Sequence, residues 1–235
     1  TARTVWYDLD GAGGFGDRGS IVRTQSANGT PLGFATVSSG QGVTGFVLDG
    51  AGNVVSRQIT ADTGATYLGG VSGMAAVSLD GQTYLYTASA NEHGIGAWHG
   101  ENSGALQSVQ QLGPSDGLPV NTPTAIVSGQ TGTSQFIVVA AAGSSSLTVM
   151  RVDQGGTLSV TDHVVDTLTT RFAGVTHLQS VTHDGRMYLL ASGSDHGLSL
   201  MSVTAEGRVV HHNSIADTLT SVLGGVSGML AVMRG

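Results

Sequence analysis

The stretch "LGGVSGM" occurs twice in this chain, at residues 68–74 and again, letter for letter, at residues 223–229. The two copies start 155 positions apart in a sequence of 235 residues. A sequence that repeats itself over this distance predicts a structure of repeated units, so the period of the repeat decides the fold.

Two further sets of residues give that period. A small residue precedes an alternating apolar run at intervals of 52, 52 and 51 positions, at Gly42, Gly94, Ser146 and Gly197. An acidic residue follows a later strand-like run at intervals of 54, 50 and 51 positions, at Asp62, Asp116, Asp166 and Asp217. The identical heptapeptides therefore mark the same place in two repeats, three periods apart.

Each period divides into four short strand-like runs. Residues 71–113 contain "VSGMAAVSL", "TYLYTAS", "GIGAWHG" and "LQSVQQLG", separated by turn-prone segments such as "DGQ" and "ANEH". The second run is almost wholly apolar or small, as expected of a strand covered on both faces, whereas the fourth run is polar, as expected of an outer edge. Four antiparallel strands per repeat of about 51 residues are typical of a blade, and the sequence predicts an all-β β-propeller.

The pattern leaves two possibilities for the number of blades, because it contains one more first strand than complete blades. Runs that fit strands two to four occur four times, but five runs fit a first strand, at residues 21–26, 71–79, 122–127, 174–183 and 225–233. The last run either closes a four-bladed ring on the N-terminal blade or begins a fifth blade. We therefore expect residues 1–31 to form an acidic, glycine-rich loop with the first strands. Residues 32–235 are expected to form about four blades, the last incomplete, in a single domain of a longer chain.

Composition narrows the possible partners. Charged residues make up only 11% of the chain and the net charge is −7, so a basic footprint for nucleic acid is absent. The chain has no cysteine, which excludes disulfides and thiolate metal sites. No apolar run reaches the roughly 18 residues that a membrane span needs.

The turns and strand starts carry a family resemblance. They are "DGQTYL" at residues 80–85, "DGRMYL" at 184–189, "DHGL" at 195–198, "DT" at 217–218 and "LGGV" at 223–226. In these turn and strand-start sequences the chain resembles the N-terminal propeller-type repeats of bacterial RTX-like, hemolysin-type calcium-binding proteins. The resemblance implies an exported, extracellular, calcium-associated protein, although the glycine-rich calcium nonapeptides of that family do not occur in this chain. The blade pattern is also similar, more weakly, to lactonase-type propellers, which implies a hydrolase as the alternative.

The segment "DLDGAGGFGD" at residues 8–17 is the candidate calcium site. Asp8, Asp10 and Asp17 supply hard carboxylate oxygens, and the glycines between them allow a tight wrap. The spacing departs from an EF-hand loop, because a loop starting at Asp8 has Ala12 at its fifth position and Gly19 at its twelfth. An acidic loop that leads into the first blade is the competing interpretation.

Histidines supply the candidate catalytic and binding groups. His93 and His196 lie at equivalent positions of two repeats, which favours a role in the turn. His177 and His183 lie on an expected first strand, which lines the central channel of a propeller, and His177 stands where the heptapeptides have glycine. An imidazole that breaks the repeat at this place is a candidate ligand or proton-transfer group, with Arg171 or His183 as its partner in a lactonase-like reaction.

Catalysis by a nucleophile has no support in the sequence, since no G-x-S-x-G turn between a strand and a helix occurs. The main hypothesis is a non-enzymatic interaction or display domain that binds a protein or glycan ligand. With aromatic residues at 5% of the chain, Trp6 and Trp98 are the strong candidates for stacking on a sugar. Self-association through open blade edges is a further expectation.

Overall fold

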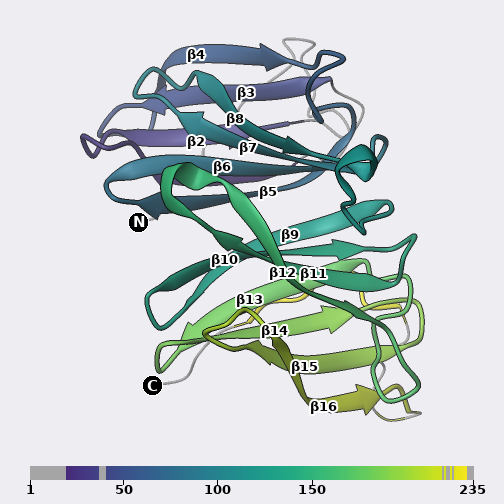
Figure 1. The fold of residues 1–235 in the computed structure, drawn as a ribbon. Coiled ribbons are helices and arrows are strands. Elements are labelled where there is room, and N and C mark those ends of the chain that lie inside the picture. Colours follow the sequence, from purple (N-terminus) through teal and green to yellow (C-terminus); the bar gives the residue numbers. More distant parts are fainter. Residues whose placement is uncertain (1–19, 37–40, 219, 221–222, 224, 232–235) are drawn as a thin grey trace.

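The computed structural model describes residues 20–36, 41–218, 220, 223 and 225–231. These residues form four antiparallel sheets of four strands each, which follow one another in chain order (Figure 1). Two short 3-10 turns, η1 (Pro114–Asp116) and η2 (Gln154–Gly156), are the helical elements of the described part of the chain. The predicted all-β propeller architecture with four-stranded blades is confirmed.

Within every blade the strands pair in sequence order, so the first strand lies at one edge and the fourth at the other. Blade one contains β1 (Ile21–Gln25), β2 (Pro31–Ala35), β3 (Gly42–Leu48) and β4 (Val54–Ala61). Blade two contains β5 (Val71–Leu79), β6 (Gln82–Ser89), β7 (Gly94–Gly100) and β8 (Leu106–Leu112). Blade three contains β9 (Pro123–Thr131), β10 (Ser134–Ala141), β11 (Ser146–Val152) and β12 (Leu158–Val165). Blade four contains β13 (His177–His183), β14 (Arg186–Ser192), β15 (Gly197–Val203) and β16 (Val209–Ala216).

Local sequence explains the hairpins between first and second strands. Asp80 and Gly81 have φ of 51° and 74°, and Asp184 and Gly185 have φ of 47° and 67°. Positive φ at both central residues defines the two-residue turn whose twist matches that of antiparallel strands, and Asp-Gly is a preferred sequence for it. The repeated "DG" therefore sets the register of β5 with β6 and of β13 with β14.

A β-bulge lies between the third and fourth strands of every blade. The register shifts at Val47/Leu48, Ala97/Trp98, Val149/Met150 and Leu200/Met201. A bulge bends its strand and increases the local twist. Its recurrence shows that the four blades share one backbone design although their sequences differ.

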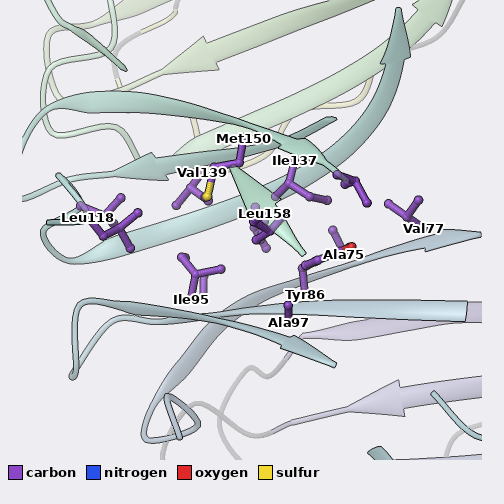
Figure 2. Packing of buried hydrophobic residues seen from close by; sticks show 14 of the residues in the cluster. Ala75, Val77, Tyr86, Ile95, Ala97, Leu118, Ile137, Val139, Met150 and Leu158 are labelled. Carbon is purple, nitrogen blue, oxygen red and sulfur yellow. The ribbon is translucent and has the colours of Figure 1, made fainter. Parts of the chain in front are cut away.

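Three apolar cores lie between successive blades, and Figure 2 shows the one between blades two and three. There Tyr86, Ile95 and Ala97 of blade two face Ile137 and Met150 of blade three, each at most 1% exposed. Similar clusters join blade one to blade two and blade three to blade four. As predicted for strands covered on both faces, all but the first residue of β6 and all but the first two of β10 are buried.

The first strands line the inner edge of this succession. Substantial packing between strands of different blades joins β1 to β5, β5 to β9 and β9 to β13, and none of it joins blade one to blade four in the described part of the chain. Side-chain hydroxyls reinforce the inner edge by donating to carbonyl oxygens of the neighbouring first strand or of the segment that leads into it. The donors and acceptors are Ser72 to Pro123 (2.7 Å), Thr124 to Val175 (2.6 Å), Ser128 to Ala76 (3.1 Å) and Ser180 to Ser128 (2.8 Å).

Two expectations from the sequence are wrong. The expected strand over residues 225–233 is absent from its described part, since residues 225–231 belong to no strand. These residues also do not pair with blade one, which has its own first strand in β1. A strand forms only where a neighbour completes its hydrogen bonds, and no described strand takes that place beside this segment. The expected boundary between residues 31 and 32 falls inside β2, because β1 and β2 together belong to blade one.

Candidate functional site at the linker end of the blades

The linkers between blades gather polar residues at one end of the molecule, here called the linker end. It comprises residues 62–70, 113–122 and 166–176, together with the turns between second and third strands. Asp62 Oδ1 accepts hydrogen bonds from Thr66 Oγ1 (2.9 Å) and from the backbone N–H of Leu68 (3.2 Å). In the third linker Asp166 Oδ1 accepts equivalent bonds from Thr170 Oγ1 (2.7 Å) and the N–H of Phe172 (3.0 Å).

The other two periodic aspartates also accept backbone hydrogen bonds. Asp116 Oδ2 accepts the N–H of Gly113 (2.9 Å) at the start of η1, and Asp217 Oδ1 accepts the N–H of Leu223. The periodic aspartates are therefore turn formers of the linkers, because one carboxylate oxygen of each accepts a backbone N–H there.

A side chain in the turn between the second and third strands of a blade accepts a backbone hydrogen bond from the start of the next blade. His93 has a left-handed backbone with φ of 57°, and its Nδ1 accepts the N–H of Thr122 (2.9 Å). Ser145, with φ of 46°, does the same through Oγ with the N–H of Gly174 (2.9 Å). His196 shares this backbone conformation, with φ of 55°. The prediction that His93 and His196 serve the turn is confirmed, and Nδ1 of His93 must be unprotonated to accept its bond.

Two carboxylates occupy equivalent places in these turns but make different bonds. Glu92 Oε2 accepts the N–H of Gly69 (2.7 Å) and the hydroxyl of Ser89 (3.1 Å). Asp195 has a side chain one methylene shorter, and its buried Oδ1 has no hydrogen-bond partner among the described residues. Burial raises the pKa of the Asp195 carboxyl, and the nearby charge of Asp166 raises it further. The Asp195 carboxylate is therefore less favourably placed for its negative charge than an exposed aspartate is.

His177 lies at this end, at the start of β13, and is half-buried. Its Nδ1 is 2.9 Å from the hydroxyl of the exposed Thr176. Arg171 belongs to the same end, where its backbone N–H donates to Ser199 Oγ (2.7 Å) and its aliphatic stem lies over Gly197. His177 and Arg171 share an end of the blade without a hydrogen bond between them.

His183 lies at the opposite end of the same strand. It lies six positions after His177, so at about 3.3 Å per residue the Cα atoms of the two histidines are about 20 Å apart. His183 Nε2 is 3.2 Å from Asp184 Oδ2, in an exposed contact at the hairpin turn. The structure therefore does not bring together the acid–base pair expected of His177 and His183.

Trp98 is not available to a ligand, which corrects the expectation that it binds one. The indole is 2% exposed in the core between blades one and two, and its Nε1 donates to Thr87 Oγ1 (3.1 Å). The alternating run on which Trp98 lies is a third strand with both faces buried, so its aromatic side chain serves packing. Trp6 and the candidate calcium ligands Asp8, Asp10 and Asp17 lie outside the described residues.

In the part of the chain that the structure describes, no group of three or more His, Asp or Glu side chains is placed to hold a metal ion. No helix there is long and apolar enough to cross a membrane.

A group of polar and aromatic side chains surrounds the exposed His212 on the outer strand of blade four. The His212 ring lies 6.0 Å from the ring of Tyr188, and its Nε2 is 2.8 Å from Ser202 Oγ. The signal that could have found this group is the alignment of Tyr188 with Tyr84 and Phe136, whose side chains lie between blades in the earlier repeats.

Comparison with known proteins bears on the fold. No family model and no curated protein matches the sequence. Among solved structures, an exo-β-1,3-galactanase from Phanerochaete chrysosporium is 13% identical, with a TM-score of 0.58 over 89% of this chain and 52% of that one. A periplasmic gluconolactonase from Pseudomonas aeruginosa is 16% identical, with a TM-score of 0.56 over 82% and 53% of the two chains. The Aleuria aurantia lectin, solved with Fucα1-6GlcNAc, is 12% identical, with a TM-score of 0.54 over 91% and 65%.

These similarities show the fold alone, because every identity is below 25%. The described part of the chain is an all-β propeller with four blades, and the chain spans about half the length of the galactanase and gluconolactonase chains. Propellers of this shape include two enzymes and a lectin, so the fold by itself does not choose between catalysis and binding.

Proposed function

We propose that the chain is a non-enzymatic binding propeller whose linker end meets a protein or glycan ligand. The observation that carries this proposal is the separation of His177 and His183 along β13, by about 20 Å, which leaves neither imidazole with the other as an acid–base partner. The remaining polar groups of the linker end support it, because Asp62, Glu92 and His93 already bond to the backbone of the linkers.

His177 and Arg171 are the side chains that we expect a ligand to meet. Both are half-buried at the linker end, and together they offer a cationic donor and an imidazole beside the inner edge. The Aleuria lectin is a glycan-binding propeller of similar fold, which favours a glycan among the possible ligands.

The test is a glycan array followed by titration of the best ligand against two matched variants. His177→Ala should weaken binding by about tenfold, whereas His183→Ala, at the other end of the same strand, should leave it unchanged. Equal effects of the two variants would contradict a site at the linker end.

A lactonase-like hydrolase is the alternative function. It is favoured by the likeness to the gluconolactonase and by the position of His177 on a first strand. Hydrolysis of a panel of lactones by the wild-type chain, abolished by His177→Ala and retained by His183→Ala, would establish this alternative and overturn the binding proposal.

We further propose that the protein is exported and associated with calcium, following its resemblance to RTX-like proteins. Asp8, Asp10 and Asp17 are the proposed ligands. Calorimetric titration with Ca²⁺ should give heat that Asp10→Ala removes; absence of heat from the wild-type chain would contradict a calcium site.

Self-association through the blade edges is proposed from the outermost strands. Val55, Ile59, Val160, Val165 and Ile215 on β4, β12 and β16 are 47–70% exposed. Sedimentation should detect a dimer that Ile59→Lys weakens, because a charged edge strand resists pairing. A monomer at every concentration tested would contradict this proposal.

A further inference from the structure

The linker end has one position whose side chain differs from one junction between blades to the next. In each linker one apolar residue packs between two blades: Leu68, Val120 and Phe172. The residue just before it is half-buried or exposed and changes each time: Tyr67, Pro119 and Arg171. Because packing between blades does not fix this second residue, it gives each junction its own surface.

Tyr67 lies flat over the backbone of blade two. A Cβ added to Gly94, which opens β7, would lie within 2.7 Å of Cγ, Cδ1 and Cδ2 of the ring. Gly94 is therefore under the face of the ring, since the tyrosine's own Cβ occupies the edge beside Cγ. A Cβ added to Gly113, which follows β8, would lie within 3.0 Å of the hydroxyl oxygen, Cζ and Cε1. One face of the ring thus rests along its whole length on glycine backbone.

The rest of the Tyr67 side chain is open to solvent. Its backbone N–H donates to Gln111 Oε1 (3.2 Å), whereas its hydroxyl bonds to none of the residues that the structure describes and is not a buried atom. Arg171, at the equivalent place, covers Gly197 with its aliphatic stem. A methylene chain therefore suffices to cover the end of a third strand, and the aromatic ring of Tyr67 needs another reason.

Polar groups that the fold does not use lie beside this ring. Asp116 Oδ2 accepts the N–H of Gly113 (2.9 Å), next to the Tyr67 hydroxyl, while Oδ1 of the exposed Asp116 bonds to no described residue. Asn91 is exposed at the turn that precedes β7, and its side-chain amide lies over Gly70 without a hydrogen bond to the described residues. The junction therefore offers an aromatic face with free acceptors and a free amide donor at its rim.

The charge of this junction is negative. A Cβ on Gly69 would lie 3.1 Å from Glu92 Oε2 and 3.2 Å from Asp62 Oδ2, so two carboxylates face each other two residues away from Tyr67. Asp116 adds a third on the other side of the ring. An anionic ligand is repelled here, whereas a neutral ligand with hydroxyl donors is favoured.

We propose that Tyr67 is the stacking platform for one neutral pyranose ring of a glycan, at the junction of blades one and two. The proposal rests on the binding function proposed above and assigns it a site. The C–H groups on one face of the sugar pack against the electron-rich face of the aromatic ring. The sugar hydroxyls bond to Asp116 and Asn91 at its rim.

The probes are methyl β-galactoside and methyl β-glucoside, with methyl β-glucuronide as the acidic match of the glucoside. Fluorine NMR of the full chain labelled with fluorotyrosine reports on each tyrosine ring, and the resonance missing from Tyr67→Leu belongs to Tyr67. At least one neutral glycoside should shift this resonance saturably below about 20 mM. The glucuronide should bind about tenfold more weakly or less.

Three variants test the stacking contact through ligand-detected NMR titration. Tyr67→Leu keeps an apolar side chain over Gly94 but loses the flat face, and it should weaken binding by about tenfold. Tyr67→Phe keeps the ring and should weaken binding by about threefold at most. Tyr188→Ala, at a half-buried tyrosine of blade four nearer the opposite end, is the matched control and should bind as the wild type does. Thermal unfolding verifies that each variant is folded.

His177→Ala distinguishes this proposal from the binding function on which it rests. Binding that Tyr67→Leu weakens and His177→Ala does not would support the stacking site and overturn the role given to His177. Binding that His177→Ala weakens and Tyr67→Leu does not would support the binding propeller and overturn the stacking site. Equal binding of glucoside and glucuronide, or no saturable binding of either neutral glycoside up to about 20 mM, would overturn it as well.

Discussion

The two copies of LGGVSGM have the same seven residues and different surroundings. In the first copy Leu68, Val71 and Met74 are 0%, 1% and 5% exposed, and residues 71–74 form the start of β5. In the second copy Leu223, Val226 and Met229 are only half-buried, and residues 225–231 form no strand. The shared sequence favours an extended backbone in both copies. The first copy forms a strand because it also has hydrogen bonds to β6 and apolar packing against blade one.

The largest expected difference concerns the leucine that opens each copy. Leu68→Ala should lower the free energy of unfolding by about 2–5 kcal/mol, because the side chain is fully buried between blades one and two. Leu223→Ala should cost less than about 1 kcal/mol, since that side chain is half-exposed. Urea unfolding of both variants measures the difference; similar losses would mean that the second copy is buried as well as the first.

The second-largest expected difference concerns the glycine with positive φ in each copy of the heptapeptide, Gly70 and Gly225. Gly70 and Gly225 both have a left-handed backbone, so alanine at either position costs about 1–2 kcal/mol. At Gly70 a Cβ would also meet Nδ2 of Asn91 at 2.3 Å, whereas at Gly225 it meets nothing within 4 Å. Gly70→Ala should therefore destabilise the chain more than Gly225→Ala.

Urea unfolding of Gly70→Ala and Gly225→Ala separates the cost of backbone strain, which both variants share, from the cost of the contact with Asn91, which only Gly70→Ala makes. If the two glycine variants lose equal stability, Asn91 moves aside without cost and the contact contributes nothing.

The third glycine of the heptapeptide gives a smaller difference. A Cβ on Gly73 would lie 3.1 Å from Cγ2 of Ile126 in blade three, tighter than ordinary contact, while the same atom on Gly228 would lie in open space. Gly73→Ala should cost about 1 kcal/mol through local overpacking, and Gly228→Ala should have no effect. Thermal unfolding with a precision of about 1 °C resolves the two outcomes. A stabilising Gly73→Ala would show that the blades have room to fill.

The same contrast explains how far the sequence predicts the structure. Strand positions, "DG" hairpins and the aspartates of the linkers follow from the 52-residue spacing, because each depends on residues close together in the chain. The strand expected at residues 225–233 and the role expected of Trp98 depend on what lies opposite, which a repeat pattern does not contain. The catalytic pairing of His177 with His183 failed for a simpler reason: both lie on one strand, and a strand holds its ends apart.

The smallest effect comes from another pair of equivalent positions, Glu92 and Asp195. The pKa of Asp195 is raised from its ordinary value of 3.8, first by burial and then by the charge of Asp166. The folded state thus holds its proton more tightly than the unfolded chain, and the ionised carboxylate lowers stability at neutral pH. Asp195→Asn should raise the free energy of unfolding at pH 7 by less than about 1 kcal/mol, because the group is partly solvated.

That gain should shrink as the pH falls toward 3.8, where the carboxyl of the wild-type chain becomes protonated. Glu92→Gln should have the opposite sign at pH 7, because Glu92 Oε2 accepts a charge-assisted bond from the N–H of Gly69 and the amide oxygen is a weaker acceptor. Urea unfolding of both variants at pH 7 and pH 4 checks the two signs. A loss of stability in Asp195→Asn at pH 7 would mean that its carboxylate is held by the linker as Glu92 is, and that the shorter side chain reaches a bond of the same kind.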